Sequence, residues 1–137
     1  MTLHSRSAIN PDGLLKFPGP VSQGMRAKAD EYIFVAGQVA LGPDGNVIAP
    51  NDMDGQTRKV LENIDILLKE AGANWDNIVD FTTYIVGSDH MGAFMGVRNE
   101  LFPQYFKSGV YPPNTLIFVS GLFKPDLILE MHVTIGI

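Results

Sequence analysis

The stretch LILEMHVTIGI, residues 127–137, has an apolar side chain at every second position. Every odd-numbered position is apolar, whereas the even-numbered positions include Glu130, His132 and Thr134. Successive side chains of a β-strand point to opposite faces of its sheet. The pattern therefore predicts a strand with one core-facing side and one polar side.

Three upstream segments also have the composition of strands, because each is rich in β-branched and aromatic side chains. They are residues 32–40 (YIFVAGQVA), 78–86 (IVDFTTYIV) and 114–122 (NTLIFVSGL). The first is expected to be buried. It ends at the turn-forming residues GPDGN (42–46), which indicate a hairpin into a short strand at Val47.

Two segments between these strands have the period of amphipathic helices. In the first, apolar side chains recur at three- and four-residue spacing over residues 60–71, and Gly72 suits the position just after a helix end. The second places its apolar face over residues 91–105. Pro103 lies inside that face and is expected to kink or restart the helix.

This order of elements is typical of an α+β fold, with a mixed sheet of about six strands and both helices on one face. A chain of 137 residues has the usual size of a single domain, and residues 1–15 are expected to form a loose arm or an early hairpin. The other face of the sheet would expose Tyr84, Phe118 and Ile128, which are too apolar for open water. We therefore expect an oligomer.

Composition excludes several classes of protein. The chain has no cysteine, which rules out a disulfide framework, a thiolate zinc site and a cysteine nucleophile. The net charge is −5 and the 10 basic residues are scattered, whereas nucleic-acid binders display a basic patch. No apolar run is long enough for a signal peptide or a membrane span. We expect a soluble, cytoplasmic protein with neither a nucleic-acid nor a membrane partner.

Two charged residues are the first candidates for chemistry. If solvent covers the polar side of the last strand, Glu130 is only a solubilising residue. A neighbouring subunit there would instead desolvate Glu130, raise its pKa and suit it to act as a general base toward water. Arg98 falls on the apolar stripe of the second helix. It either extends past the edge of the core or lies in a cleft to receive an anion bidentately.

Motifs for cofactors and hydrolytic nucleophiles are missing from the sequence. Ser22 has no G-x-S-x-G around it, the glycines form neither a P-loop nor a dinucleotide fingerprint, and the three histidines lack the spacing of a zinc site. Nucleotide cofactors and serine hydrolysis are therefore unsupported.

Six segments in register resemble the YjgF/RidA (reactive-intermediate deaminase) family, which is also called endoribonuclease L-PSP. They run in order from residue 19 to the end of the chain. They are GPVSQG (19–24), YIFVAGQ (32–38), a helix running from QT (56–57) to AG (71–72), NE followed by YF (99–106), PPNT (112–115) and LEM (129–131).

The resemblance implies a chorismate-mutase-like α+β fold and a homotrimer with clefts between subunits. It also implies cofactor-independent hydrolysis of imines and enamines to a keto acid and ammonia. By position, the role of activating water falls on Glu130. The resemblance places substrate contacts at Asn114, Thr115, Gly37, Gln38, Ser22 and Asn99.

The sequence departs from the family at the substrate-binding arginine, which is Asn114 here. An amide offers two donors and no charge, whereas a guanidinium offers five donors and a fixed charge. Losing a bidentate charged pair would cost about 2–5 kcal/mol of substrate binding. Val21 and Ala36 likewise replace a tyrosine and a serine of the family motifs. We therefore expect a re-aimed site, in which Arg98 is the candidate for the missing cation.

Two functions stay open on the sequence. The first is a hydrolase or deaminase acting on an imine, an enamine or a related small C–N substrate. The alternative is a non-catalytic trimer that binds a small molecule or a partner. The family's ribonuclease name suggests a third function, which the scattered basic residues oppose.

Overall fold

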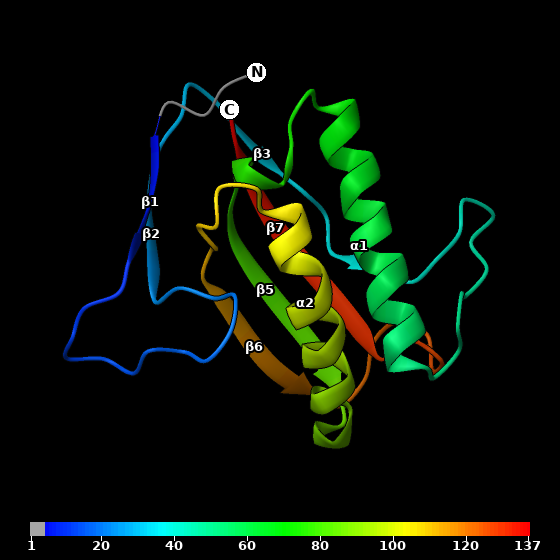
Figure 1. Ribbon diagram of the computed structural model, residues 1–137. Helices are drawn as coiled ribbons and strands as arrows, with labels where there is room; N and C mark the ends of the chain where they lie inside the picture. The colour runs from blue at the N-terminus through cyan, green and yellow to red at the C-terminus, as the bar shows by residue number, and fades with distance from the viewer. Residues whose placement is uncertain (1–4) are drawn as a thin grey trace.

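Two helices cover one face of a five-stranded mixed sheet in the computed structural model, which describes residues 5–137 (Figure 1). The strand order is β3-β7-β5-β6, and β4 also pairs with β7. Only β5 and β6 run parallel, so the predicted α+β fold with a mixed sheet is confirmed. The strands are β3 (Tyr32–Phe34), β4 (Gln38–Val39), β5 (Ile78–Val86), β6 (Asn114–Val119) and β7 (Leu129–Gly136).

The alternation of the last strand separates the two faces of the sheet as predicted. Leu129, Met131, Val133 and Ile135 of β7 are buried in the core under the helices. Glu130 is half-buried on the opposite face, which we call the open face. Each register partner on β5 shares the face of its β7 neighbour: buried Thr83 lies opposite Met131, and half-buried Tyr84 lies opposite Glu130.

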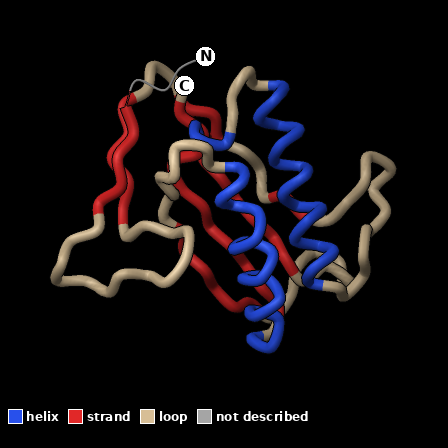
Figure 2. The backbone as a smooth tube through the Cα atoms, in the orientation of Figure 1, coloured by secondary structure: helices blue, strands red, loops and turns tan. Residues whose placement is uncertain are grey.

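The helices α1 (Met53–Glu70) and α2 (Met91–Tyr105) lie side by side on the core face, as Figure 2 shows in blue in front of the red strands. Gly72 has a φ of 70° just beyond α1, a conformation that glycine adopts without a steric cost. Helix α2 neither ends nor restarts at Pro103 but continues to Tyr105. Pro103 lies in the last turn, so its missing N–H removes one hydrogen bond at the end of the helix.

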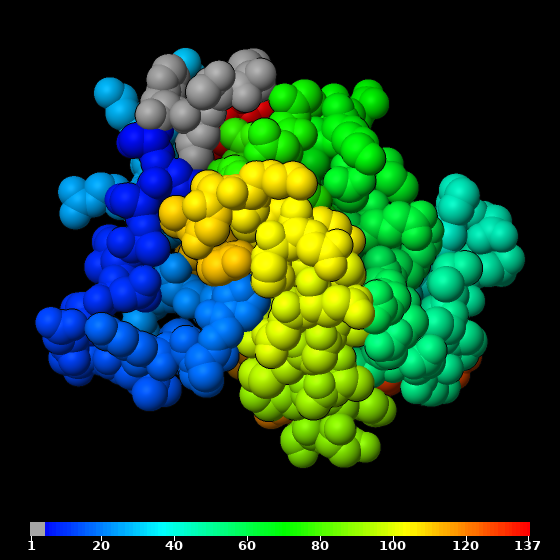
Figure 3. Space-filling model, viewed as in Figure 1, coloured from blue at the N-terminus to red at the C-terminus, as the bar shows by residue number. Residues whose placement is uncertain are grey.

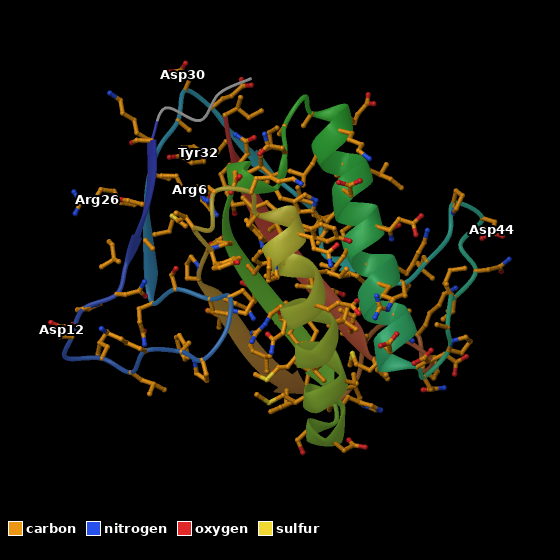
Figure 4. All side chains as sticks on the ribbon, in the orientation of Figure 1. Arg6, Asp12, Arg26, Asp30, Tyr32 and Asp44 are labelled. Carbon is orange, nitrogen blue, oxygen red and sulfur yellow. The ribbon has the colours of Figure 1, made fainter. Side chains whose placement is uncertain are left out.

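A separate hairpin joins β1 (Ser5–Ile9) to β2 (Gly24–Lys28). Residues 5–9 are therefore the first strand of an early hairpin and not a loose arm, whereas residues 1–4, including His4, lie outside the described residues. Arg6 anchors the hairpin by donating from Nε to the carbonyl of Ile78 (3.1 Å) and from Nη1 to Asp76 (3.3 Å). Figure 4 shows Arg6 pointing toward the body of the protein and Arg26 pointing away from it.

The structure corrects three expectations about the sheet. The segment 32–40 is not one buried strand, because residues 35–37 separate β3 from β4 and the side chain of Phe34 is 77% exposed at the edge. Phe118, expected on the open face, shares the helix-covered face with its buried register partner Ile85. Ile128, also expected on the open face, is buried. Its backbone N–H donates to Gln56 Oε1 inside the core, which holds the chain inward just before β7 begins.

Two short 3-10 turns precede β5 and α2. Between α1 and β5 lies the 3-10 turn η1 (Trp75–Asn77), and before α2 lies the turn η2 (Ser88–His90). Over residues 5–137, no helix is long and apolar enough to cross a membrane.

Candidate functional site

A cavity of about 370 Å³ lies where the loop after β1 meets α2 and β6. Figure 3 shows the blue N-terminal segment abutting the yellow atoms of α2 on this side of the molecule. We call this space the α2 pocket. It is lined by Phe17, Pro18, Val21, Met91, Met95, Arg98, Asn99, Asn114 and Leu116.

Arg98 and Asn99 form the polar end of the α2 pocket. The Arg98 side chain is only 5% exposed, and burial lowers its pKa from the ordinary arginine value. Its Nε and Nη2 both donate to Asn99 Oδ1, at 3.3 Å. Gly19 covers the pair: it has a φ of 124°, and a Cβ there would lie 3.3 Å from both Arg98 Nη2 and Asn99 Oδ1.

Asn114, at the start of β6, faces the same pocket from the sheet. Its Oδ1 accepts a hydrogen bond from the buried hydroxyl of Thr83 at 2.8 Å. Because that contact orients the amide, the Nδ2 donors of Asn114 remain for a ligand, and no acceptor among residues 5–137 takes them. Asn114 thus offers neutral donors to the pocket, and the guanidinium of the pocket comes from Arg98 on α2.

Glu130 belongs to a second group of residues, on the open face. It lies against the backbone of Gly37: a Cβ added at Gly37 would be 2.3 Å from Glu130 Oε2 and 2.8 Å from its Cδ. No side chain or backbone group among residues 5–137 forms a hydrogen bond or ion pair with the Glu130 carboxylate. Residue 37 must therefore be glycine for the Glu130 carboxylate to occupy this position.

Three of the eight predicted site residues therefore meet in the α2 pocket: Asn114, Asn99 and Arg98. Gly37 and Glu130 meet elsewhere, on the open face. Since Asn114 faces the helices and Glu130 faces away from them, one subunit does not bring the two groups together.

The other three predicted residues have separate surroundings. Ser22 is buried, and its hydroxyl donates to the carbonyl of Tyr111, which ties the pocket loop to the segment before β6. Gln38 donates to the carbonyl of Ala36 at 3.2 Å, and Thr115 is exposed beside Thr82. Their roles in binding stay predictions.

Sequence reasoning missed most of the pocket's apolar lining. Met91 and Met95 have the spacing of a helix face that packs in the core, so nothing in the sequence indicated that they line a cavity. Phe17 and Leu116 carry no motif that marks a site. Arg98 was the one residue whose place on an apolar stripe signalled the pocket.

The three positions that were expected to change one site together, 21, 36 and 114, separate in the structure. Val21 and Asn114 do share the pocket, but Ala36 is not among its lining residues and is the neighbour of Gly37. In the part of the chain that the structure describes, no three His, Asp or Glu side chains are arranged to hold a metal ion.

Comparison with known proteins agrees with this fold. The sequence profile of the family named Endoribonuclease L-PSP matches residues 15–136. A RutC family protein from Pyrococcus abyssi is 35% identical over 114 residues, which cover 83% of this chain and 84% of that protein.

Two solved structures extend the likeness. YyfB of the conserved Rid protein family, from Yersinia pestis, is 26% identical, with a TM-score of 0.83 and coverage of 96% of this chain and 98% of that one. YyfA from the same organism is 30% identical, with a TM-score of 0.68 and coverage of 97% and 100%. The chain therefore belongs to the Endoribonuclease L-PSP family, which is the YjgF/RidA family of Rid proteins.

Proposed function

We propose that the protein is a cofactor-independent hydrolase that deaminates an imine, an enamine or a related small C–N substrate. The observation that carries the proposal is the Glu130 carboxylate, which is half-buried against Gly37 and has no partner among residues 5–137. A carboxylate in such a place is available to accept a proton from a water molecule. Family membership supports the same class of chemistry.

The proposed reaction needs one water and one proton carrier. Glu130 accepts a proton from water as the water oxygen adds to the imine carbon, and the C=N double bond becomes a C–N single bond. Glu130 then returns the proton to the nitrogen. In the resulting carbinolamine, Glu130 takes the remaining hydroxyl proton and passes it to the nitrogen, so that the C–N bond breaks, the C=O bond forms, and ammonia leaves together with a keto acid. An enamine first takes a proton on carbon to become the imine, so both substrates follow one route.

A complete site in this proposal takes its two halves from two copies of the chain. Glu130 and the α2 pocket lie on opposite faces of the sheet within one subunit. The open face also exposes apolar side chains that a neighbouring copy would bury, among them Phe34 and Tyr32 at the edge. A homotrimer, the assembly expected for this family, would place the Glu130 of one copy against the α2 pocket of the next.

Replacing the proposed proton carrier tests the activity. Imines made in situ from L-amino acids by an amino acid oxidase serve as the substrates, and release of ammonia and keto acid is followed against the uncatalysed rate. Glu130→Gln keeps the size and shape of the side chain. It should lower kcat by about 10²- to 10⁴-fold, the usual contribution of a general base. A full rate in the Glu130→Gln protein would refute the mechanism.

Hybrid trimers test the shared site. Glu130→Gln and Asn114→Leu chains with different tags are co-expressed, and the mixed trimers are assayed beside each parent. If the two halves come from different copies, each mixed trimer contains one complete site of its three, so the mixed trimers should recover about a third of the wild-type rate. Recovery of no activity, or a monomer in light scattering, would rule out the intersubunit site.

A non-catalytic binding protein is the second candidate function. The observation that favours it is the separation of the two groups, which leaves each subunit with a formed ligand pocket but no general base inside it. Under this alternative, keto acids and amides would bind in the α2 pocket, and no imine would be hydrolysed faster than in buffer.

A further inference from the structure

The guanidinium of Arg98 is buried without a charged partner. Its side chain is 5% exposed, and no carboxylate among residues 5–137 forms an ion pair with it. The two hydrogen bonds that it makes both go to Asn99 Oδ1, at a long 3.3 Å. An uncompensated buried charge lowers the stability of a fold, so an arginine kept in this state calls for another explanation.

Arg6 shows what a structural arginine looks like in the same protein. It also has little exposure, yet its Nη1 pairs with Asp76 and its Nε donates to the Ile78 carbonyl. Its guanidinium carbon lies 5.6 Å from the centre of the Phe106 ring. Among the described residues, Arg98 has neither an acidic partner nor an aromatic ring that it stacks on, and it borders a cavity instead.

The α2 pocket pairs this cation with neutral donors and apolar walls. Asn114 contributes an amide whose Nδ2 has no acceptor among residues 5–137. No acidic side chain lines the pocket. The walls come from aromatic, thioether and aliphatic side chains, which are Phe17, Pro18, Val21, Met91, Met95 and Leu116.

We infer that Arg98 is the anion receptor of the α2 pocket, in place of residue 114, and that it binds a monocarboxylate with a bulky apolar substituent. The inference rests on the proposed function, because the carboxylate would belong to the substrate of that same site. The ligand carboxylate accepts hydrogen bonds from the guanidinium and from Asn114 Nδ2. Its apolar group lies between Met91, Met95 and the pocket loop.

The size of the pocket sets the size of the substituent. A dry engineered cavity of about 150 Å³ accommodates benzene. The α2 pocket, at about 370 Å³, is far larger than a three-carbon acid requires. A small ligand would leave apolar walls in contact with water, so a branched aliphatic or aromatic group gains more from burial here than a methyl group does.

Binding measurements test the inference separately from turnover. The probes are the 2-oxo acids phenylpyruvate, 4-methyl-2-oxopentanoate and pyruvate, each beside its neutral primary amide, titrated calorimetrically into the wild-type protein. Each bulky acid should bind at least about 10-fold more tightly than its own amide, which loses the charged hydrogen-bonded contact, and about 10-fold more tightly than pyruvate, which buries less apolar surface. Equal affinity for acid and amide would overturn the inference.

The Arg98→Met and Arg58→Met proteins form a matched pair. Both lose one positive charge, but Arg58 is a surface residue that pairs with Asp54 and Glu100 away from the pocket. Arg98→Met should weaken binding of each acid about 10- to 100-fold, with its amide nearly unaffected. Arg58→Met should bind like the wild type. Arg98→Lys, which keeps the charge but loses the planar fork, should fall between them.

Thermal stability separates a receptor from a structural residue. Methionine removes the unpaired buried charge and retains the apolar stem, so Arg98→Met should melt at or above the wild-type temperature. A large drop in Tm would overturn the inference, since it would show that Arg98 supports the fold. Tight, Arg98-dependent binding without turnover would refute only the proposed hydrolysis. Turnover with acid binding unchanged in Arg98→Met would refute only the role of Arg98.

Discussion

Gly37→Ala should disable the proposed reaction while leaving the fold intact. The added Cβ would lie 2.3 Å from Glu130 Oε2, which is about 1.1 Å short of the 3.4 Å at which ordinary contact begins. The crowded atoms are the end of a flexible side chain, so Glu130 moves and the backbone stays. A displacement of about 1 Å in a catalytic group is enough to cost on the order of 10²-fold in rate.

Stability should change little in the Gly37→Ala protein. Gly37 is not among the residues with positive φ, so alanine fits its backbone without strain. Restricting the unfolded chain stabilises the protein by about 0.4–1 kcal/mol, and moving Glu130 off its preferred rotamer costs a similar amount, about 0.5–1.5 kcal/mol. The net change in the free energy of unfolding should therefore stay within about 1 kcal/mol.

The assay compares imine turnover and urea unfolding of Gly37→Ala with a control glycine. Gly96 lies on the exposed side of α2, and a Cβ there meets nothing within 4 Å. Gly96→Ala should keep full activity and gain up to about 1 kcal/mol from helix propensity. Wild-type turnover in a folded Gly37→Ala protein would refute the reasoning, because the position of Glu130 would then be irrelevant to the reaction.

The remaining predictions concern the two buried polar anchors of the fold. Arg6→Met should lower the free energy of unfolding by about 2 kcal/mol, because its hydrogen-bonded contacts are lost. Arg26→Met, on the outward side of the hairpin, should have almost no effect in the same urea titration. Equal free energies of unfolding for the two variants would show that Arg6 does not anchor the hairpin. Gln56→Leu should lower the free energy of unfolding by about 3 kcal/mol, because the Gln56 amide hydrogen-bonds three backbone groups. The control is Gln104→Leu, at an exposed position, and both variants are compared in thermal melts. Similar Tm values for the two would contradict the role of Gln56 as an anchor.

Local pattern was enough to predict most of the secondary structure. The segment 78–86 was predicted as a strand with the bounds of β5, and the alternation around Glu130 correctly assigned the two faces of β7. These predictions succeeded because the hydrophobic period depends only on which side of an element meets the core. The break between β3 and β4 was missed, because it accompanies a register shift against β7, from the pair Phe34 and Thr134 to the pair Gln38 and Met131, and register depends on contacts between residues distant in sequence.

The sequence by itself determined the family and the α+β class, and it singled out Asn114 and Arg98 as candidate site residues, Arg98 because it falls on an apolar stripe. Only the tertiary structure decided that these two residues share one pocket and that Glu130 lies on the opposite face of the sheet. The reason is that composition and period specify the environment of each residue separately. Which side chains meet depends on strand register and on how α2 and the loop after β1 pack against β6, and these arrangements exist only in the folded chain.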